Sequence, residues 1–170
     1  YNSSRKVGGS VRLVLSDDFN FPQDMKWYPD YEQGLWEDST RLRAAYNQII
    51  VDNERLIRAQ TLAEWVPASK LLAAGTERSL PHACSDFRKV NAPTRLGTVS
   101  VVTLKLSEPD TLTRTTILSE PGEIYASASN LYVATRHWWW WPAPGQEDTT
   151  YFHKFDISSP EAAVYKASGT

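Results

Sequence analysis

The sequence predicts an all-β fold of about two antiparallel four-stranded sheets, with a helix-containing insertion in the first. Three observations predict it. Short runs rich in Val, Leu, Ile, Thr and Tyr recur between turn residues, before residue 17 and again after residue 95. Four of these runs fall within residues 120–170, which is typical of a four-stranded meander. One long stretch of helical periodicity separates the two β-rich parts.

Composition limits the class of protein. With 170 residues, 41% of them hydrophobic and 22% charged, the chain is large and apolar enough for a globular domain with its own core. The formal net charge of −2 predicts no basic face for nucleic acid. No apolar run approaches the ~20 residues that a membrane helix needs, so we expect no membrane span.

The first β-rich part begins with a turn and continues as a strand. The turn is the sequence VGGS at residues 7–10, and the strand covers residues 11–16. In this strand Leu13 and Leu15 alternate with Arg12 and Ser16, which predicts at least one buried face.

The strongest helix of the chain is predicted over residues 40–58. Asp38, Ser39 and Thr40 offer side chains that cap a helix N-terminus. Apolar residues then recur at helical spacing, while most charged residues fall on the other face. Pro67 ends a short helix that begins near Thr61.

Beyond residue 95 the sequence predicts strands separated by turns. Both sets of alternating side chains in residues 99–106 are partly apolar, which predicts a strand covered on both faces. Glu120-Pro121-Gly122 is a turn, and Ser129-Asn130 is the centre of a tight hairpin. The predicted strands are 96–106, 112–119, 123–127, 131–135, 149–157 and 162–168.

Four antiparallel strands in about 40 to 50 residues are the size of one propeller blade. We therefore predict a partial first blade from residues 1–16 and 96–119, an insertion over 17–95, and a second blade over 120–170. Both long connections join the second strand of a blade to the third. Two blades cannot close a ring and would leave two full sheet faces exposed, so we expect a processed product or a piece of a longer chain.

Several short motifs occur across most of the chain. They are IYAS at 124–127, LYVAT at 131–135, HKFDI at 153–157, YKASG at 165–169, RKVGG at 5–9 with VRLVL at 11–15, EWVP at 64–67 and CSDF at 84–87. These motifs resemble those of the secreted β-propeller domain family found in bacterial and archaeal surface proteins. The resemblance implies a propeller architecture and a location outside the cytoplasm, and the family carries no assigned reaction. It also implies that the residues here are an interior segment of such a domain.

No catalytic set is evident, so we expect no enzyme, no cofactor and no metal site. The chain contains three histidines but no Gly-x-Ser-x-Gly turn, no phosphate-binding loop and no His-Glu-x-x-His motif. His153 and Asp156 lie at odd separation on one strand and therefore on opposite faces, which predicts a structural role for His153. Cys84 is interpreted either as a small buried side chain or as half of a disulfide with a partner outside these residues.

The sequence RHWWWWP at residues 136–142 has two interpretations. The tryptophans either pack on the helix, against Tyr46, Ile49 and Ile50, or form an exposed platform for a protein or a glycan. Strand alternation predicts that two rings face the core and two face outward. Trp27 and Trp65 are predicted to anchor the insertion on the blades. The predicted contact residues are Trp138, Trp139, Trp140 and Trp141, with Tyr28, Tyr31 and Trp36 from the insertion.

These features favour a non-catalytic binding or assembly module outside the cytoplasm. Its partners would be other protein chains, or the rest of a longer chain of its own. One alternative is a glycan-binding or polysaccharide-acting surface enzyme, which needs a carboxylate pair about 5 to 9.5 Å apart. Glu147 and Asp148 are the carboxylates near the tryptophans in sequence. The other alternative is a structural subunit of an envelope or filament, with open sheet edges completed by neighbouring copies.

Overall fold

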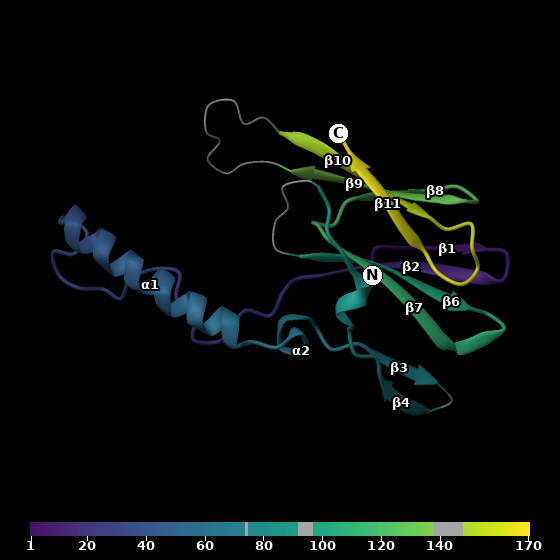
Figure 1. Ribbon diagram of the computed structural model, residues 1–170, viewed down its shortest axis with the longest axis horizontal. Coiled ribbons are helices and arrows are strands. Elements are labelled where there is room, and N and C mark those ends of the chain that lie inside the picture. Colours follow the sequence, from purple (N-terminus) through teal and green to yellow (C-terminus); the bar gives the residue numbers. More distant parts are fainter. Residues whose placement is uncertain (74, 92–96, 138–147) are drawn as a thin grey trace. The chain divides into compact units, whose positions relative to one another are not determined.

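The computed structural model describes residues 1–73, 75–91, 97–137 and 148–170 (Figure 1). The chain divides into two compact units. Unit 1 consists of Tyr1–Phe19 and Val66–Thr170, and unit 2 is Asn20–Trp65. Strands dominate unit 1 and helix dominates unit 2, so the prediction of an all-β fold with a helical insertion is confirmed. The residue boundaries predicted for the two blades and the insertion stay a prediction.

The first sheet of unit 1 has the strand order β1-β2-β6-β7-β5. Its neighbours are antiparallel, except that β5 pairs with β7 in parallel. Gly8 has a φ of 57° in the turn between β1 and β2, a conformation that favours glycine. The strands are β1 (Ser3–Val7), β2 (Ser10–Asp17), β5 (Phe87–Arg88), β6 (Thr98–Lys105) and β7 (Glu108–Leu118).

The second sheet is the predicted four-stranded meander, with the order β11-β10-β9-β8. The Ser129-Asn130 turn is held locally, because the backbone N–H of Asn130 donates to Oγ of Ser127 over 3.1 Å, and the N–H of Ser127 donates to the Asn130 carbonyl over 2.8 Å. The strands are β8 (Glu123–Ala126), β9 (Asn130–His137), β10 (Thr149–Asp156) and β11 (Val164–Gly169).

The core of unit 1 lies between these two sheets. Alternation brings one face of each sheet inward, so that Val14, Val99 and Val101 meet Leu131, Val133 and Phe155. Val99, Val101 and Phe155 have no exposed surface. This packing joins the two predicted blades face to face.

Side chains of the first sheet donate hydrogen bonds to backbone carbonyls of the connection between β10 and β11. Arg12 is 1% exposed, and its Nη2 donates to the carbonyl oxygens of Ile157 and Ser159. Oγ of Ser10 donates to the Pro160 carbonyl over 2.9 Å, and Oγ1 of Thr115 donates to the Ala163 carbonyl over 2.7 Å. Among the described residues no carboxylate forms an ion pair with Arg12. Burial is unfavourable for its charged guanidinium and lowers the pKa of Arg12.

Residues 66–91 of unit 1 add small elements beside the first sheet. β3 (Lys70–Ala73) and β4 (Thr76–Ser79) form an antiparallel hairpin, and η1 (Cys84–Asp86) is a turn of 3-10 helix. Cys84 is exposed, so its interpretation as a buried side chain is wrong, and a disulfide with a partner outside these residues stays a prediction. Its position at the start of a short surface helix explains the exposure.

The outer face of the first sheet, turned away from the second sheet, is covered in part. Ser100, Val102 and Thr116 point to this face and are buried. Arg78 of β4 donates to the carbonyl of Asp110 in β7, and Nη2 of Arg114 donates to the Leu80 carbonyl over 3.3 Å. The expectation that both outer sheet faces are fully exposed is therefore wrong for the first sheet.

Unit 2 contains α1 (Ser39–Ala59) and α2 (Leu62–Trp65), together with the loop that precedes α1. The predicted helix over residues 40–58 is confirmed, with Asp38 as its N-cap, where Oδ1 accepts from the backbone N–H of Thr40 over 3.0 Å and of Arg41 over 3.1 Å. No residue of α1 is buried, although its periodicity is the strongest in the chain. Neither helix is long and apolar enough to cross a membrane, among the residues described.

Candidate binding surfaces

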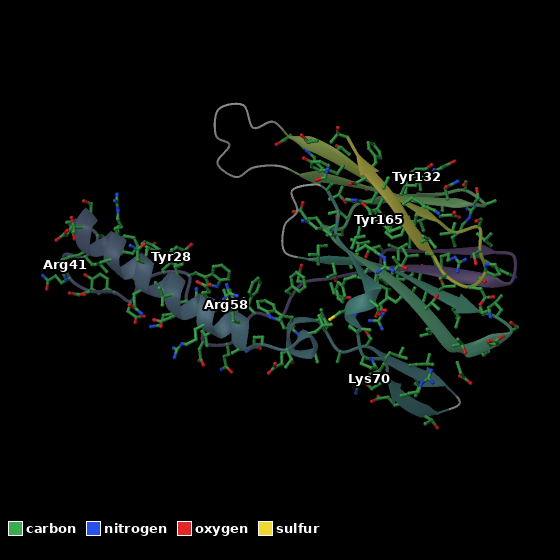
Figure 2. All side chains as sticks on the ribbon, viewed as in Figure 1. Tyr28, Arg41, Arg58, Lys70, Tyr132 and Tyr165 are labelled. Carbon is green, nitrogen blue, oxygen red and sulfur yellow. The ribbon has the colours of Figure 1, made fainter. Side chains whose placement is uncertain are left out.

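The predicted contact residues of the insertion are all exposed. Tyr28 is 71% exposed, Tyr31 87% and Trp36 50%. Figure 2 shows Tyr28 beside α1. Trp138–Trp141, the other predicted contact residues, lie outside the described residues, so both interpretations of the tryptophan row stay predictions.

Contacts within unit 2 hold the aromatic loop against α1. Asn53 of α1 donates through Nδ2 to the Lys26 carbonyl over 2.7 Å, and accepts from the Lys26 N–H over 3.1 Å. Glu32 forms an ion pair with Arg41, and Leu35 is buried. These contacts fix the backbone of the loop on α1, so the aromatic side chains of the loop start from defined positions. We call Trp27, Tyr28, Tyr31 and Trp36 the aromatic surface of unit 2.

Trp27 and Trp65 both contact Phe21, with edge-to-face geometry and ring centroids 5.4 Å and 5.9 Å away. Trp27 nevertheless remains 59% exposed. These contacts lie inside unit 2, so the predicted anchoring of the insertion on the blades stays a prediction. The helix adds further exposed apolar side chains to the unit, at Ile50, Val51 and Ile57.

The outer face of the second sheet is a second exposed apolar surface. Tyr125 is 68% exposed, Phe152 49% and Val164 47%. Alternation explains their position, because their neighbours in sequence point into the core. Tyr125 and Tyr132 are directly opposed across β8 and β9, with ring centroids 6.4 Å apart, and Nζ of Lys154 lies 5.8 Å from the centroid of Tyr132.

A cavity of about 650 Å³ lies on the outer face of the first sheet, below residues 69–86. Side chains of β2, β6 and β7 line it on one side, and Arg114 contacts His82 at its polar part. Sequence reasoning missed this feature. The alternating Leu13, Leu15, Val102 and Leu104 signal a second apolar sheet face, but no local pattern brings His82 to Arg114.

The distance between the side chains of Ser119 and His153 is that of a catalytic nucleophile and its base, but both side chains are buried and the histidine lacks an orienting partner among the described residues. Oγ of Ser119 lies 3.2 Å from Nε2 of His153, and each residue is only 1% exposed. Nδ1 of His153 is buried and has no hydrogen-bond partner in the part of the chain that the structure describes, so no carboxylate there orients the ring. Burial lowers the pKa of His153 and favours the neutral form. A buried pair cannot reach a substrate, and this arrangement fits the structural role predicted for His153.

The carboxylates near the tryptophan row offer no pair that the structure describes. Asp148 forms an ion pair with Arg136, with Nη2 to Oδ2 at 2.7 Å, and Glu147 lies outside the described residues. Within the described part of the chain, no three His, Cys, Asp or Glu side chains are placed to hold a metal ion.

Comparison with known proteins gives one match. A family model with the description "Beta propeller domain" matches residues 1–170. Comparisons with curated proteins and with solved structures give no match. The two packed and mainly antiparallel sheets agree with this match, since a propeller is built from four-stranded antiparallel blades.

Proposed function

The chain belongs to the β-propeller domain family, and on this premise we propose that it is a non-catalytic protein-binding or assembly module that acts outside the cytoplasm. Its partners are other protein chains or further blades of its own polypeptide. The proposed location comes from the resemblance to secreted surface proteins. The buried position of the Ser119 and His153 pair supports a non-catalytic role.

The observation that carries the proposal is the aromatic surface of unit 2. Its four rings are each at least half exposed, although Trp and Tyr are large apolar side chains that stabilise interfaces when they are buried. Full burial of one such side chain contributes about 1.5–3 kcal/mol. Unit 2 buries none of its helix residues, so it gains little of this free energy by itself. A partner that covers the loop would bury these aromatic side chains, and their burial would stabilise the complex.

The outer face of the second sheet supports the assembly part of the proposal. Blades of a propeller pack on one another through their sheet faces. Tyr125, Phe152 and Val164 present such a face, and no described residue of the chain covers them. A further blade, from the same polypeptide or from another chain, would bury these side chains.

Cross-linking of the native polypeptide in its complexes tests the proposal. Lys26 lies two residues from Tyr28, and its side chain is 55% exposed. A lysine-reactive reagent followed by mass spectrometry should therefore join Lys26 to another chain or to a further domain. The double variant Tyr31→Ala and Trp36→Ala should lose these cross-links and keep its helical circular dichroism, because neither side chain is buried.

Thr76→Ala is the matched control, because it truncates an exposed side chain of unit 1 and should leave the Lys26 cross-links unchanged. Native mass spectrometry of the same material gives the mass of the natural polypeptide and of its complexes. A polypeptide that is monomeric, complete in these residues and free of Lys26 cross-links to any other segment would contradict the proposal.

A further inference from the structure

Arg12 of the first sheet binds the connection between the third and fourth strands of the second sheet. This connection covers residues 157–163, between β10 and β11. Nη2 of Arg12 donates to the backbone carbonyl of Ile157 over 3.3 Å, and also to that of Ser159. The Arg12 side chain is 1% exposed, so it lies within the interface between the two sheets. A charged donor on one sheet thus binds a loop of the sheet that follows it in the chain.

The two sheets can be aligned on the hairpin that joins their first two strands. Strand β2 begins at Ser10 and β9 begins at Asn130, and each of these residues directly follows the turn of its hairpin. Arg12 and Tyr132 lie two residues further on in their strands. They therefore occupy equivalent positions in the two blades.

These two residues also lie on equivalent faces of their sheets. Arg12 lies on the face of the first sheet that packs on the second sheet. Tyr132 lies on the outer face of the second sheet, because Leu131 and Val133 on either side of it point into the core. Blades of a propeller repeat about a central channel, so the face that a blade turns to the next blade is the same in each. The outer face around Tyr132 therefore corresponds to the face that carries Arg12.

The second sheet has a cation at the corresponding point, although the cation comes from the neighbouring strand. Thr103 of β6 is directly opposite Arg12 of β2. At the corresponding pair of the second sheet, Lys154 of β10 is opposite Tyr132 of β9. Nζ of Lys154 lies 5.8 Å from the centroid of the Tyr132 ring, so its charge lies over the position that corresponds to Arg12. Among the described residues, no acceptor forms a hydrogen bond with Nζ of Lys154.

A following blade of the same polypeptide fits this face better than a second copy of the chain. In the first sheet of a second copy, the third-to-fourth-strand connection is only residues 106–107, between β6 and β7, and so short a turn offers few carbonyls. Residues 66–91 also cover part of the outer face with which that sheet would have to pack. By contrast, the second blade follows the first in the chain and packs on the face that carries Arg12. Consecutive elements are usually neighbours in space, so the equivalent face of the second blade suits the blade that comes next.

We propose that Tyr132 and Lys154 form the docking site for the third-to-fourth-strand connection of the following blade of the same polypeptide, with Nζ of Lys154 donating to backbone carbonyl oxygens of that connection. This site rests on the assembly role proposed above, and it specifies the residues that carry out that role. Lys154 has in the second sheet the role that Arg12 has in the first. Its charged donor satisfies carbonyl oxygens that would otherwise be buried without a partner.

Photo-cross-linking of the native polypeptide tests which segment lies over Tyr132. Tyr132→p-benzoylphenylalanine places a photoreactive ketone on this face, and irradiation should join it to the third-to-fourth-strand connection of the following blade. Thr113→p-benzoylphenylalanine is the matched control, because Oγ1 of Thr113 donates to the Glu161 carbonyl, so this probe should join residues 157–163. Cross-links from Tyr132 to another polypeptide, to another part of the following blade or to no segment would overturn the proposal.

Acetylation of the unsubstituted native polypeptide tests the same contact if the Tyr132 variant does not fold. In the folded polypeptide Lys154 should react at least about 10-fold more slowly than the exposed Lys89, because a charged hydrogen bond must break first. In urea the two lysines should react at similar rates. Equal rates in the folded polypeptide would overturn the proposal.

These tests separate the docking site from the function proposed above. Lys26 cross-links to another chain, found together with a failure of the Tyr132 and Lys154 tests, would reject this docking site and leave the protein-binding role of unit 2 in place. A monomeric native polypeptide that is complete in residues 1–170 and free of Lys26 cross-links would reject both.

Discussion

Unit 1 has a core of large apolar side chains between two sheets, although others lie on its outer faces, whereas in unit 2 such side chains lie mostly on the surface. Phe155 of unit 1 is 0% exposed, while Tyr31 of unit 2 is 87% exposed. A sheet hides one face by packing it on another sheet, but a single helix with one loop against it cannot surround its own apolar side chains. Unit 1 is therefore stabilised by its own core, whereas unit 2 leaves most of its large apolar side chains available to a partner.

The largest expected effect is loss of the unit 1 core. Phe155 packs edge-to-face on Tyr165, with ring centroids 5.4 Å apart. Phe155→Ala should lower the free energy of unfolding by about 3–5 kcal/mol, because it leaves a cavity between the sheets. Phe152→Ala, on the exposed face of the same strand, should change it by less than about 0.5 kcal/mol. Urea denaturation followed by near-ultraviolet circular dichroism measures both changes, and equal effects would contradict the assignment of Phe155 to the core and Phe152 to the surface.

A second prediction concerns Gly122, in the connection between β7 of the first sheet and β8 of the second sheet. A Cβ on Gly122 would lie 2.1 Å from the carbonyl oxygen of Ala134, which is too close for two backbone segments to remain in place. Gly122→Ala should therefore lower the free energy of unfolding by about 1–3 kcal/mol. Gly9→Ala is the control, because a Cβ there meets nothing within 4 Å. A melting temperature of Gly122→Ala equal to that of the control would contradict this account.

Lowering the pH should lower the free energy of unfolding of unit 1, because His82 and His153 become protonated. Burial lowers the pKa of His153, and burial with Arg114 lowers that of His82. As the pH falls below about 6.5, these histidines bind protons in the unfolded chain before they do so in the folded chain. The free energy of unfolding therefore decreases between about pH 6.5 and the lower pKa that each histidine has in the folded chain. The slope should reach about 1.4 kcal/mol per pH unit for each histidine.

Unfolding measured from about pH 8 to about pH 5 checks this dependence. His153→Gln and His82→Gln should each reduce the slope, and the double variant should remove most of it. Unit 2 contains no histidine, so its helical signal should not share this dependence before unit 1 unfolds. A slope that survives in the double variant would assign the effect to other groups.

The smallest expected effect is local to unit 2. Asp38 caps α1, and Asp38→Ala should cost about 1 kcal/mol of helix stability. Glu37→Ala changes the neighbouring carboxylate, which is not the cap, and serves as the control. Helical circular dichroism during thermal unfolding measures the difference. A decrease of the same size in the stability of unit 1 would contradict a local effect and would show that the two units unfold cooperatively.

Much of the fold was predictable from local patterns. The Asp38 cap and the apolar spacing located α1 to within a residue at each end, and the four strands after residue 120 formed the predicted meander. The parallel strand β5 was not predictable, because its two residues carry no periodicity. The exposure of Cys84 was not predictable either, since a single small side chain carries no information about what lies over it.

The candidate binding residues also include some that the sequence predicted and some that it did not. The exposure of Tyr28, Tyr31 and Trp36 could be expected from their polar and aperiodic surroundings. The cavity at Arg114 could not be expected, because His82 lies 32 residues away in the chain. No pattern in the sequence identifies a partner for the aromatic surface of unit 2, and the cross-linking experiment on Lys26 addresses that question directly.

Local periodicity in the sequence was sufficient to predict most of the long strands, the main helix and the side chains that share a face, because periodicity is a local property of the backbone. It did not predict the short strands β3, β4 and β5, and it could not show which faces are covered. The same alternation places Phe155 in a core and Phe152 at the surface, and it leaves Val102 beneath a segment from elsewhere in the chain. The covering of a face depends on residues distant in sequence, and no local pattern encodes their approach.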